Sequence, residues 1–125
     1  MTNHKYQPVR ASAELDPSTG QVGESAMLLS DINVPDINQC LGVAAVQPGE
    51  PSTAELAHST AEVMFVAEGR GELITSAVTV EFSKGDAIYI PADLKHALRN
   101  TGESVLVSVF SFPAPNRPAD STTPH

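Results

Sequence analysis

The spacing of turn signals limits the fold of this chain more than any other feature of its sequence. Short apolar segments alternate with Gly- and Pro-containing turns about every 8 to 12 residues, for example at residues 48–49, 84–86 and 101–102. No window of about eleven residues combines an apolar period of 3.6 with helix caps. We therefore predict about seven to nine short strands, folded as an all-β sandwich or barrel.

The composition fits one folded domain with a hydrophobic core. Of the 125 residues, 41% are hydrophobic, and this length leaves little room for a second domain. We expect a polar N-terminal arm at residues 1–25, the barrel domain at residues 26–113, and a Pro-rich C-terminal tail at residues 114–125.

The charge and the apolar pattern exclude several kinds of partner. The net charge is −8, and the seven Lys and Arg residues form no basic stripe, which argues against nucleic acid. No apolar run approaches the roughly 20 residues that span a bilayer. Because the N-terminus also has no apolar signal segment, we expect a cytoplasmic protein without membrane contact. The single cysteine, Cys40, excludes an internal disulfide and is predicted to be a small buried residue.

Two of the four histidines lie in places that favour a common site. His4 and His125 fall in the expected tails, whereas His58 and His96 each lie beside a predicted strand and near a Gly/Pro turn. Single histidines on strands are usually satisfied polar groups. Two histidines in such similar surroundings are more readily explained by a common site to which both contribute.

Glu62 stands at the beginning of an apolar segment, four residues after His58. In a strand, Glu62 shares a face with Met64 and Val66, because side chains alternate with a period of two. A carboxylate in such apolar surroundings is costly unless it is paired or binds a metal. The alternative, that Glu62 caps the strand end in solvent, stays open at this point.

The segment GDAIYIPADLKHALRN, residues 85–100, resembles the second motif of the cupin superfamily. Gly85, Pro91, His96 and Asn100 have the spacing of that motif, and Asp93 replaces its usual second glycine. The resemblance extends over roughly residues 40–112 and implies a cupin-type β-barrel, the double-stranded β-helix or jelly roll.

The first cupin motif is matched less completely. It resembles the run at residues 62–69 and the Pro-Gly pair at 48–49, but its two paired histidines are reduced. Counting back from Glu62 with a gap of three residues makes His58 the second of the paired histidines. Leu56 then occupies the position of the first. Counting forward from the Pro-Gly pair instead places Glu55 at the first position. We favour the first count because it places an observed histidine at a ligand position.

The resemblance implies a metal site with a reduced ligand set. The expected ligands are His58, Glu62 and His96, with Glu55 as a fourth ligand or a nearby base. Glu55, or Glu62 where it does not bind the metal, is the predicted catalytic base. Two histidines and one carboxylate suit Fe(II) best, and Zn, Mn or Ni would also accept them. A degenerate site without metal is the alternative.

The family likeness also implies a pocket inside the barrel, with an apolar side at Leu56. The candidates for its wall or the inner core are Met64, Tyr89, Leu98, Val107 and Phe110. We expect a metal-dependent enzyme that acts on a small organic molecule, either an Fe(II) oxygenase or a Lewis-acid isomerase, cyclase or lyase. The alternative is a cupin that binds or senses a small molecule without catalysis. A homodimer is expected, with residues 26–34 as a candidate intersubunit strand.

Overall fold

The computed structural model describes residues 8–12 and 25–119, and these residues contain eight β-strands and no helix. The strands are β1 (Ser25–Leu29), β2 (Cys40–Val46), β3 (Glu62–Glu68), β4 (Arg70–Ile74), β5 (Thr79–Ser83), β6 (Ala87–Ile90), β7 (Ala97–Asn100) and β8 (Leu106–Phe112). The all-β prediction is therefore confirmed. No helix in the described part of the chain is long and apolar enough to cross a membrane.

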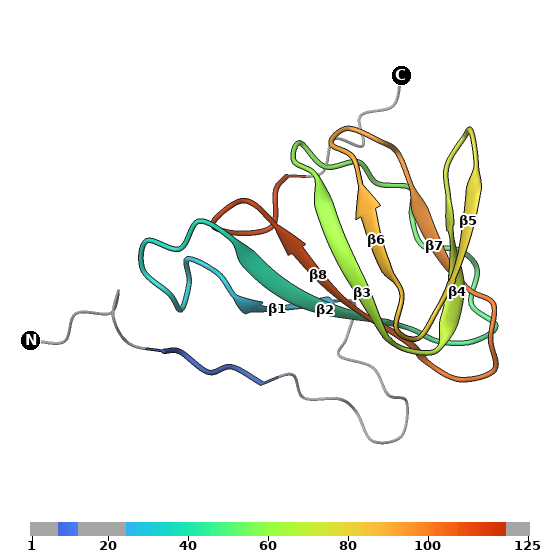
Figure 1. Cartoon of the computed structure of the whole chain (residues 1–125), viewed down its shortest axis with the longest axis horizontal. Coiled ribbons are helices and arrows are strands. Elements are labelled where there is room, and N and C mark those ends of the chain that lie inside the picture. The colour runs from blue at the N-terminus through green and yellow to red at the C-terminus, as the bar shows by residue number, and fades with distance from the viewer. Residues whose placement is uncertain (1–7, 13–24, 120–125) are drawn as a thin grey trace, which may run out of the picture.

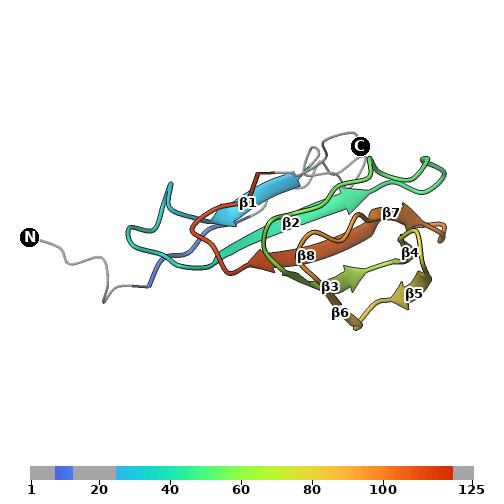
Figure 2. The same cartoon turned by 90° about the horizontal axis from the view of Figure 1, so that it is seen from above.

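The strands form two antiparallel sheets that face each other (Figure 1). The larger sheet has the order β1-β2-β8-β3-β6, and the smaller sheet has the order β5-β4-β7. Within the described residues, β1 is an edge strand paired with β2. Seen from above, β1 lies on the side of the molecule away from β5 (Figure 2). The role of β1 between subunits and the three predicted domain boundaries stay predictions, and most of the N-terminal arm falls outside the described residues.

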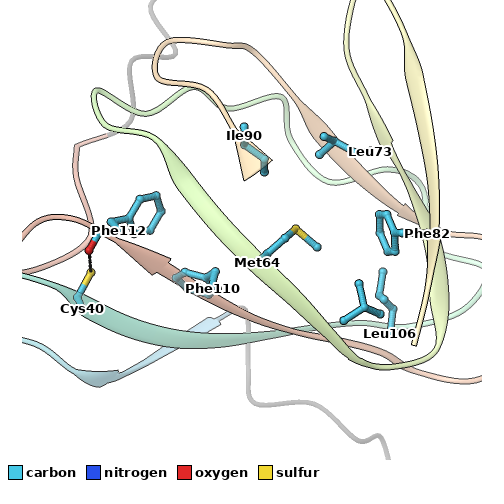
Figure 3. Close-up of a cluster of buried hydrophobic side chains, with 9 residues drawn as sticks. Cys40, Met64, Leu73, Phe82, Ile90, Leu106, Phe110 and Phe112 are labelled. Atoms are coloured by element: carbon cyan, nitrogen blue, oxygen red, sulfur yellow. Dashed lines mark hydrogen bonds between the residues drawn. The ribbon is translucent and has the colours of Figure 1, made fainter. Parts of the chain in front are cut away.

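The hydrophobic core fills the space between the two sheets (Figure 3). Side chains from both sheets contribute, and the largest buried ones come from β6 and β8. The core residues are Cys40, Met64, Val66, Leu73, Phe82, Ile90, Leu106, Phe110 and Phe112. Apolar burial of this kind contributes about 25 cal/mol per Å² and is the main favourable term for a domain of this size.

Strand β3 alternates as its sequence predicts. Glu62, Met64 and Val66 are 8%, 3% and 0% exposed, whereas Val63 and Phe65 are 52% and 48% exposed. Glu62 therefore lies on the inner face with the core, and the alternative that it caps the strand end in solvent is wrong. The outer face of β3 leaves apolar side chains exposed, although both faces looked equally apolar in the sequence.

Cys40 is part of the core, as predicted. It is 2% exposed, and its Sγ lies 3.8 Å from the carbonyl oxygen of Phe112 (Figure 3). Burial raises the pKa of the Cys40 thiol above its ordinary value, because desolvation disfavours the thiolate. A neutral thiol is a poor nucleophile, so Cys40 acts as a packing residue.

Two glycines with positive φ mark the ends of the β3–β4 and β5–β6 turns. Gly69 has φ +83° and Gly85 has φ +96°, a conformation that L side chains rarely adopt. Their surroundings differ sharply. A Cβ at Gly69 would meet the carbonyl oxygen of Val105 at 2.6 Å and Cα of Leu106 at 2.9 Å, whereas a Cβ at Gly85 would meet nothing within 4 Å.

The two glycines give a matched pair of substitutions. We expect Gly85→Ala to lower the free energy of unfolding by ~1–2 kcal/mol, the cost of a left-handed L residue. Gly69→Ala adds a clash with the backbone of the β7–β8 turn, so we expect a total loss of about 3 kcal/mol or more. Urea denaturation of both variants in chelator measures this difference. Equal losses of unfolding free energy in the two variants would show that the β7–β8 turn moves away from the added Cβ at no cost in stability.

Candidate metal centre

Three buried side chains with metal-binding atoms meet inside the barrel. His58 comes from the segment before β3, Glu62 is the first residue of β3, and His96 immediately precedes β7. Glu62 Oε1 lies 3.5 Å from His58 Nε2 and 3.7 Å from His96 Nε2. One ligand atom from each residue lies within 4.8 Å of the others. The structure thus brings together the three residues that the cupin resemblance implies as metal ligands.

Backbone hydrogen bonds hold the two histidine segments together. Leu56 and His96 pair as an antiparallel bridge, in which each N–H donates to the other's carbonyl oxygen at 2.9 Å. The N–H of Asp93 donates to the carbonyl oxygen of His58 at 2.7 Å. Asp93 has φ +65°, which explains why glycine is usual at this motif position and why Asp, a residue that tolerates this conformation, replaces it.

The orientation and tautomer of the His96 ring are set by a carbonyl group. Its Nδ1 lies 2.9 Å from the carbonyl oxygen of Leu94, and because a carbonyl oxygen only accepts, Nδ1 must be the donor. The Nε2 atom of His96 lies 3.7 Å from Oε1 of Glu62, and in this tautomer it can act as a metal ligand.

This donor set suits a divalent metal ion. Two imidazoles and one carboxylate form the set typical of non-haem Fe(II) sites with open positions, and Zn or Mn also accept such ligands. The hydrogen bond from His96 Nδ1 to a carbonyl oxygen is the usual support of a metal-binding histidine. The residues present therefore fit the metal that the cupin resemblance implies.

The structure also favours one of the two registers for the first motif. Leu56 and His58 both border the central cavity, and Ala57 between them is buried on the opposite side. Glu55 is exposed and does not border the cavity. Leu56 thus occupies the place beside His58 on the inner face. The geometry does not bring Glu55 to the three ligands, and nothing in it supports Glu55 as a fourth ligand or base.

The three ligands lie in the wall of a cavity of about 820 Å³ that opens to solvent. Most of the remaining wall is apolar, and its polar residues are Gln47, Glu50, Ser52, Thr53, Ser108 and Arg117. The bordering core and wall residues include Leu56, Met64, Ile90, Leu98, Ser108, Phe110 and Phe112. A space of this size accommodates a small organic molecule, and an apolar wall with a few polar groups is typical of such sites.

Two of the five predicted wall or core residues lie elsewhere than in the cavity wall. Tyr89 is 65% exposed on the outer face of β6, so its prediction is wrong. The reason is strand alternation, because its neighbour Ile90 is 2% exposed and takes the inner face. Val107 is buried at 9% exposure but does not border the cavity, whereas Ser108 does.

Sequence reasoning missed two residues that shape the site. The ring of Phe112 packs edge-on against His58 with ring centroids 5.0 Å apart, and it was predictable from Phe110 by strand alternation. Arg117 also borders the cavity, although it follows β8 in a segment expected to be a tail. A Pro-rich segment carries no periodic signal that shows where it lies, so its contact was not predictable.

Comparison with known proteins identifies the family. The sequence matches the cupin domain family over residues 42–112, more than half of the chain, and the protein belongs to that family. It is 28% identical over 97 residues to the polyketide synthase CurC of Streptomyces cyaneus, which covers 78% of this chain and 63% of CurC. Protein SchB of Streptomyces halstedii is also 28% identical, over 78% of this chain and 70% of SchB. The chain thus spans less than two thirds of CurC.

Solved structures with the same fold support this assignment. A cupin 2 conserved barrel domain protein from Salinispora arenicola superposes with a TM-score of 0.60 at 22% identity, over 81% of this chain and 80% of that chain. Oxalate decarboxylase of Bacillus subtilis superposes with a TM-score of 0.67 at 21% identity, over 78% of this chain but only 28% of that chain. At these identities the likeness shows the fold alone. The predicted cupin-type barrel is confirmed.

The geometry predicts which substitutions release a bound metal. We expect His58→Ala and His96→Ala each to weaken metal binding by at least about tenfold, since even changes beyond the ligands cost 10–100-fold. Glu55→Gln is the matched control and should leave binding unchanged, because Glu55 is exposed outside the cavity.

The measurement is titration of chelator-treated protein with Fe(II), Mn(II) and Zn(II), followed by metal analysis after gel filtration. Retention unaffected by either histidine substitution would contradict this ligand set. A loss of metal retention in Glu55→Gln would instead support the count that places Glu55 at the first histidine position.

Proposed function

We propose that this protein is a metal-dependent enzyme that acts on a small carbonyl-containing molecule in the barrel. The reaction class is cyclisation, isomerisation or elimination by proton transfer. The observation that carries the proposal is the convergence of His58, Glu62 and His96 within 4.8 Å in the wall of an 820 Å³ cavity. Three buried groups with metal-binding atoms at the edge of an open apolar cavity are typical of a reactive centre rather than of packing.

His58, Glu62 and His96 would hold a divalent metal, which would supply Lewis acidity toward a substrate oxygen. The side chains around it have distinct tasks. The carbonyl group of Leu94 orients His96, and backbone pairing with Leu56 fixes its position. Apolar side chains such as Met64 and Ile90 border the cavity and favour contact with an apolar part of the substrate.

Glu62 is the residue in the site best suited to move a proton. Its carboxylate has two oxygens, so one can bind the metal while the other accepts a proton from the substrate carbon next to a carbonyl group. Ser108, 4% exposed and bordering the cavity, has a hydroxyl that can donate to a substrate oxygen. Glu55 has no part in this proposal.

The relatives support the class of substrate. CurC is named a polyketide synthase, and polyketides carry alternating carbonyl groups whose intervening C–H bonds are acidic. Such a substrate suits a site that combines a Lewis acid with a carboxylate. The proposal therefore favours a polyketide-like 1,3-dicarbonyl compound over a sugar or an amino acid.

A second candidate function is oxygenation of the same class of molecule. It is favoured by the ligand set itself, because two histidines and one carboxylate leave several positions open on Fe(II) for substrate and O₂. Structures similar in fold include one concerned with the Mn(II) centres of oxalate decarboxylase, so Mn(II) belongs in the same tests. Fe(II) remains the favoured metal for this second function.

The test uses 1-phenyl-1,3-butanedione in D₂O under argon, with hydrogen–deuterium exchange at the carbon between its carbonyl groups followed by NMR. We expect metal-loaded protein to accelerate exchange beyond free metal at the same concentration. Glu62→Gln should lower the rate per bound metal by about 10²–10⁴-fold, the usual contribution of a general base. Glu72→Gln is the matched control, because Glu72 pairs with Arg99 and does not border the cavity.

The outcomes separate the functions. Exchange under argon supports the proton-transfer enzyme, whereas conversion only in air, with O₂ consumed, would support the oxygenase. Tight binding of the dione without exchange or O₂ uptake would contradict both and favour the non-catalytic binding cupin.

A further inference from the structure

Among the described residues, Ser108 is the one buried polar side chain without a hydrogen-bond or ion-pair partner. The buried polar residues in this part of the chain are Ser30, His58, Glu62, His96, Asn100 and Ser108. The side-chain amide of Asn100 donates to two carbonyl oxygens at 2.8 Å, and the hydroxyl of Ser30 accepts from the N–H of Ile32 at 3.2 Å. The three metal-binding residues face one another. The hydroxyl of Ser108 alone is left for a group from outside the protein.

The surroundings of Ser108 are apolar. It is 4% exposed, and its cross-strand partners are Ala44 on β2 and Val66 on β3. Its neighbours on the same face of β8 are Leu106 and Phe110, which point from that strand into the core in Figure 3. A buried hydroxyl without a partner lowers stability, because it loses its hydrogen bonds to water and gains none in return. Alanine would fit here without that cost, so packing does not explain the serine.

The central cavity can hold the missing partner. Ser108 borders this cavity together with His58, Glu62 and His96, and these four are its only buried polar residues within the described chain. A ligand that enters the cavity can therefore pair with the Ser108 hydroxyl, which both donates and accepts.

Ser108 lies far from the metal centre along the sheet. It pairs with Val66, which is four residues beyond Glu62 on β3. At about 3.4 Å per residue, the two positions are about 14 Å apart along the strand. The pair of Met64 and Phe110 lies between them and borders the same cavity. One ligand oxygen cannot serve both places, so Ser108 needs a second one.

We propose that Ser108 forms a second binding subsite, which pairs with a neutral oxygen, such as a phenolic hydroxyl, at the end of the ligand away from the metal centre. The substrate class is then an aromatic or polyketide-like molecule with oxygen groups at both ends and an apolar middle. This substrate class rests on the proposed function, whereas the subsite itself depends only on Ser108 and the cavity.

The test compares 1-(4-hydroxyphenyl)-1,3-butanedione with 1-(4-methylphenyl)-1,3-butanedione, which has nearly the same shape but a methyl group in place of the hydroxyl. Isothermal titration calorimetry uses the full chain freed of metal by a chelator, in slightly acidic buffer. Both probes are neutral there, so Glu50 and Arg117, which also border the cavity, act on both alike. We expect the ratio of the two affinities, hydroxyl over methyl, to fall about tenfold in Ser108→Ala, the contribution of one hydrogen bond.

Ser111 on the same strand provides the matched control. Its hydroxyl donates to the carbonyl oxygen of Cys40 at 2.7 Å, and it does not border the cavity. Ser111→Ala should keep the full preference for the hydroxyl probe, but it should lower the urea midpoint because a hydrogen bond within the protein is lost. Ser108→Ala should show the opposite result: the preference is lost, and the urea midpoint stays unchanged or rises.

Three results would overturn the inference: the same affinity ratio in wild type and Ser108→Ala, no binding of either probe, or a urea midpoint that falls in Ser108→Ala as in Ser111→Ala. The last result would give the Ser108 hydroxyl a structural role. Because these measurements are made without metal, they are independent of the metal titration and the exchange assay. A preference lost with Ser108 but no metal binding would leave the subsite standing and contradict the proposed enzyme.

Discussion

The short backbone bridge between Leu56 and His96 is the interaction on which the site depends. Its two hydrogen bonds of 2.9 Å join the segment before β3 to the segment before β7, forty residues apart in the chain. A third bond from Asp93 to the carbonyl oxygen of His58 holds the same segments together. Because these contacts involve only the backbone, they position both imidazoles whichever side chains surround them. The placement of the three residues is therefore set by the backbone of the barrel.

This rigid frame makes the burial of Glu62 understandable. The carboxylate is 8% exposed and shares the inner face of β3 with Met64 and Val66, so its charge is costly without a cation. Two imidazoles, which accept a proton or bind a metal, face its Oε1 at 3.5 and 3.7 Å. A barrel selected for stability alone would be served better by an apolar residue at this position. The buried carboxyl group of Glu62 beside two imidazoles is the feature on which the proposed metal site rests.

The sequence pattern predicted most of the fold, and the cupin resemblance named His58, Glu62 and His96 as the expected ligands. Strand alternation alone left Glu62 open between the inner face and solvent, because both faces of β3 are apolar, whereas the second-motif spacing identified His96. The sequence does not show which of two neighbouring residues faces inward in a segment without a clear polar and apolar pattern. Tyr89 and Ile90 are both apolar enough to face inward, and only pairing in the sheet decides between them. Likewise, Leu56 and Glu55 differ by one residue, and only the bridge to His96 selects Leu56 for the inner face.

The loss of a ligand at Leu56 and the presence of Arg117 give the cavity two unlike ends. Near His58, Glu62 and His96 the wall carries the apolar side chain of Leu56 at the position where the first cupin motif usually has a histidine, so this position offers no polar group. At the other end a guanidinium group lies 5.9 Å from the ring of Phe110 in a protein of net charge −8. Glu50 borders the same cavity, so its wall carries charged groups of both signs besides the three converging residues. The cavity therefore offers a ligand apolar surroundings at Leu56 and charged surroundings at Glu50 and Arg117, and this difference comes from residues outside the two motifs' matched positions.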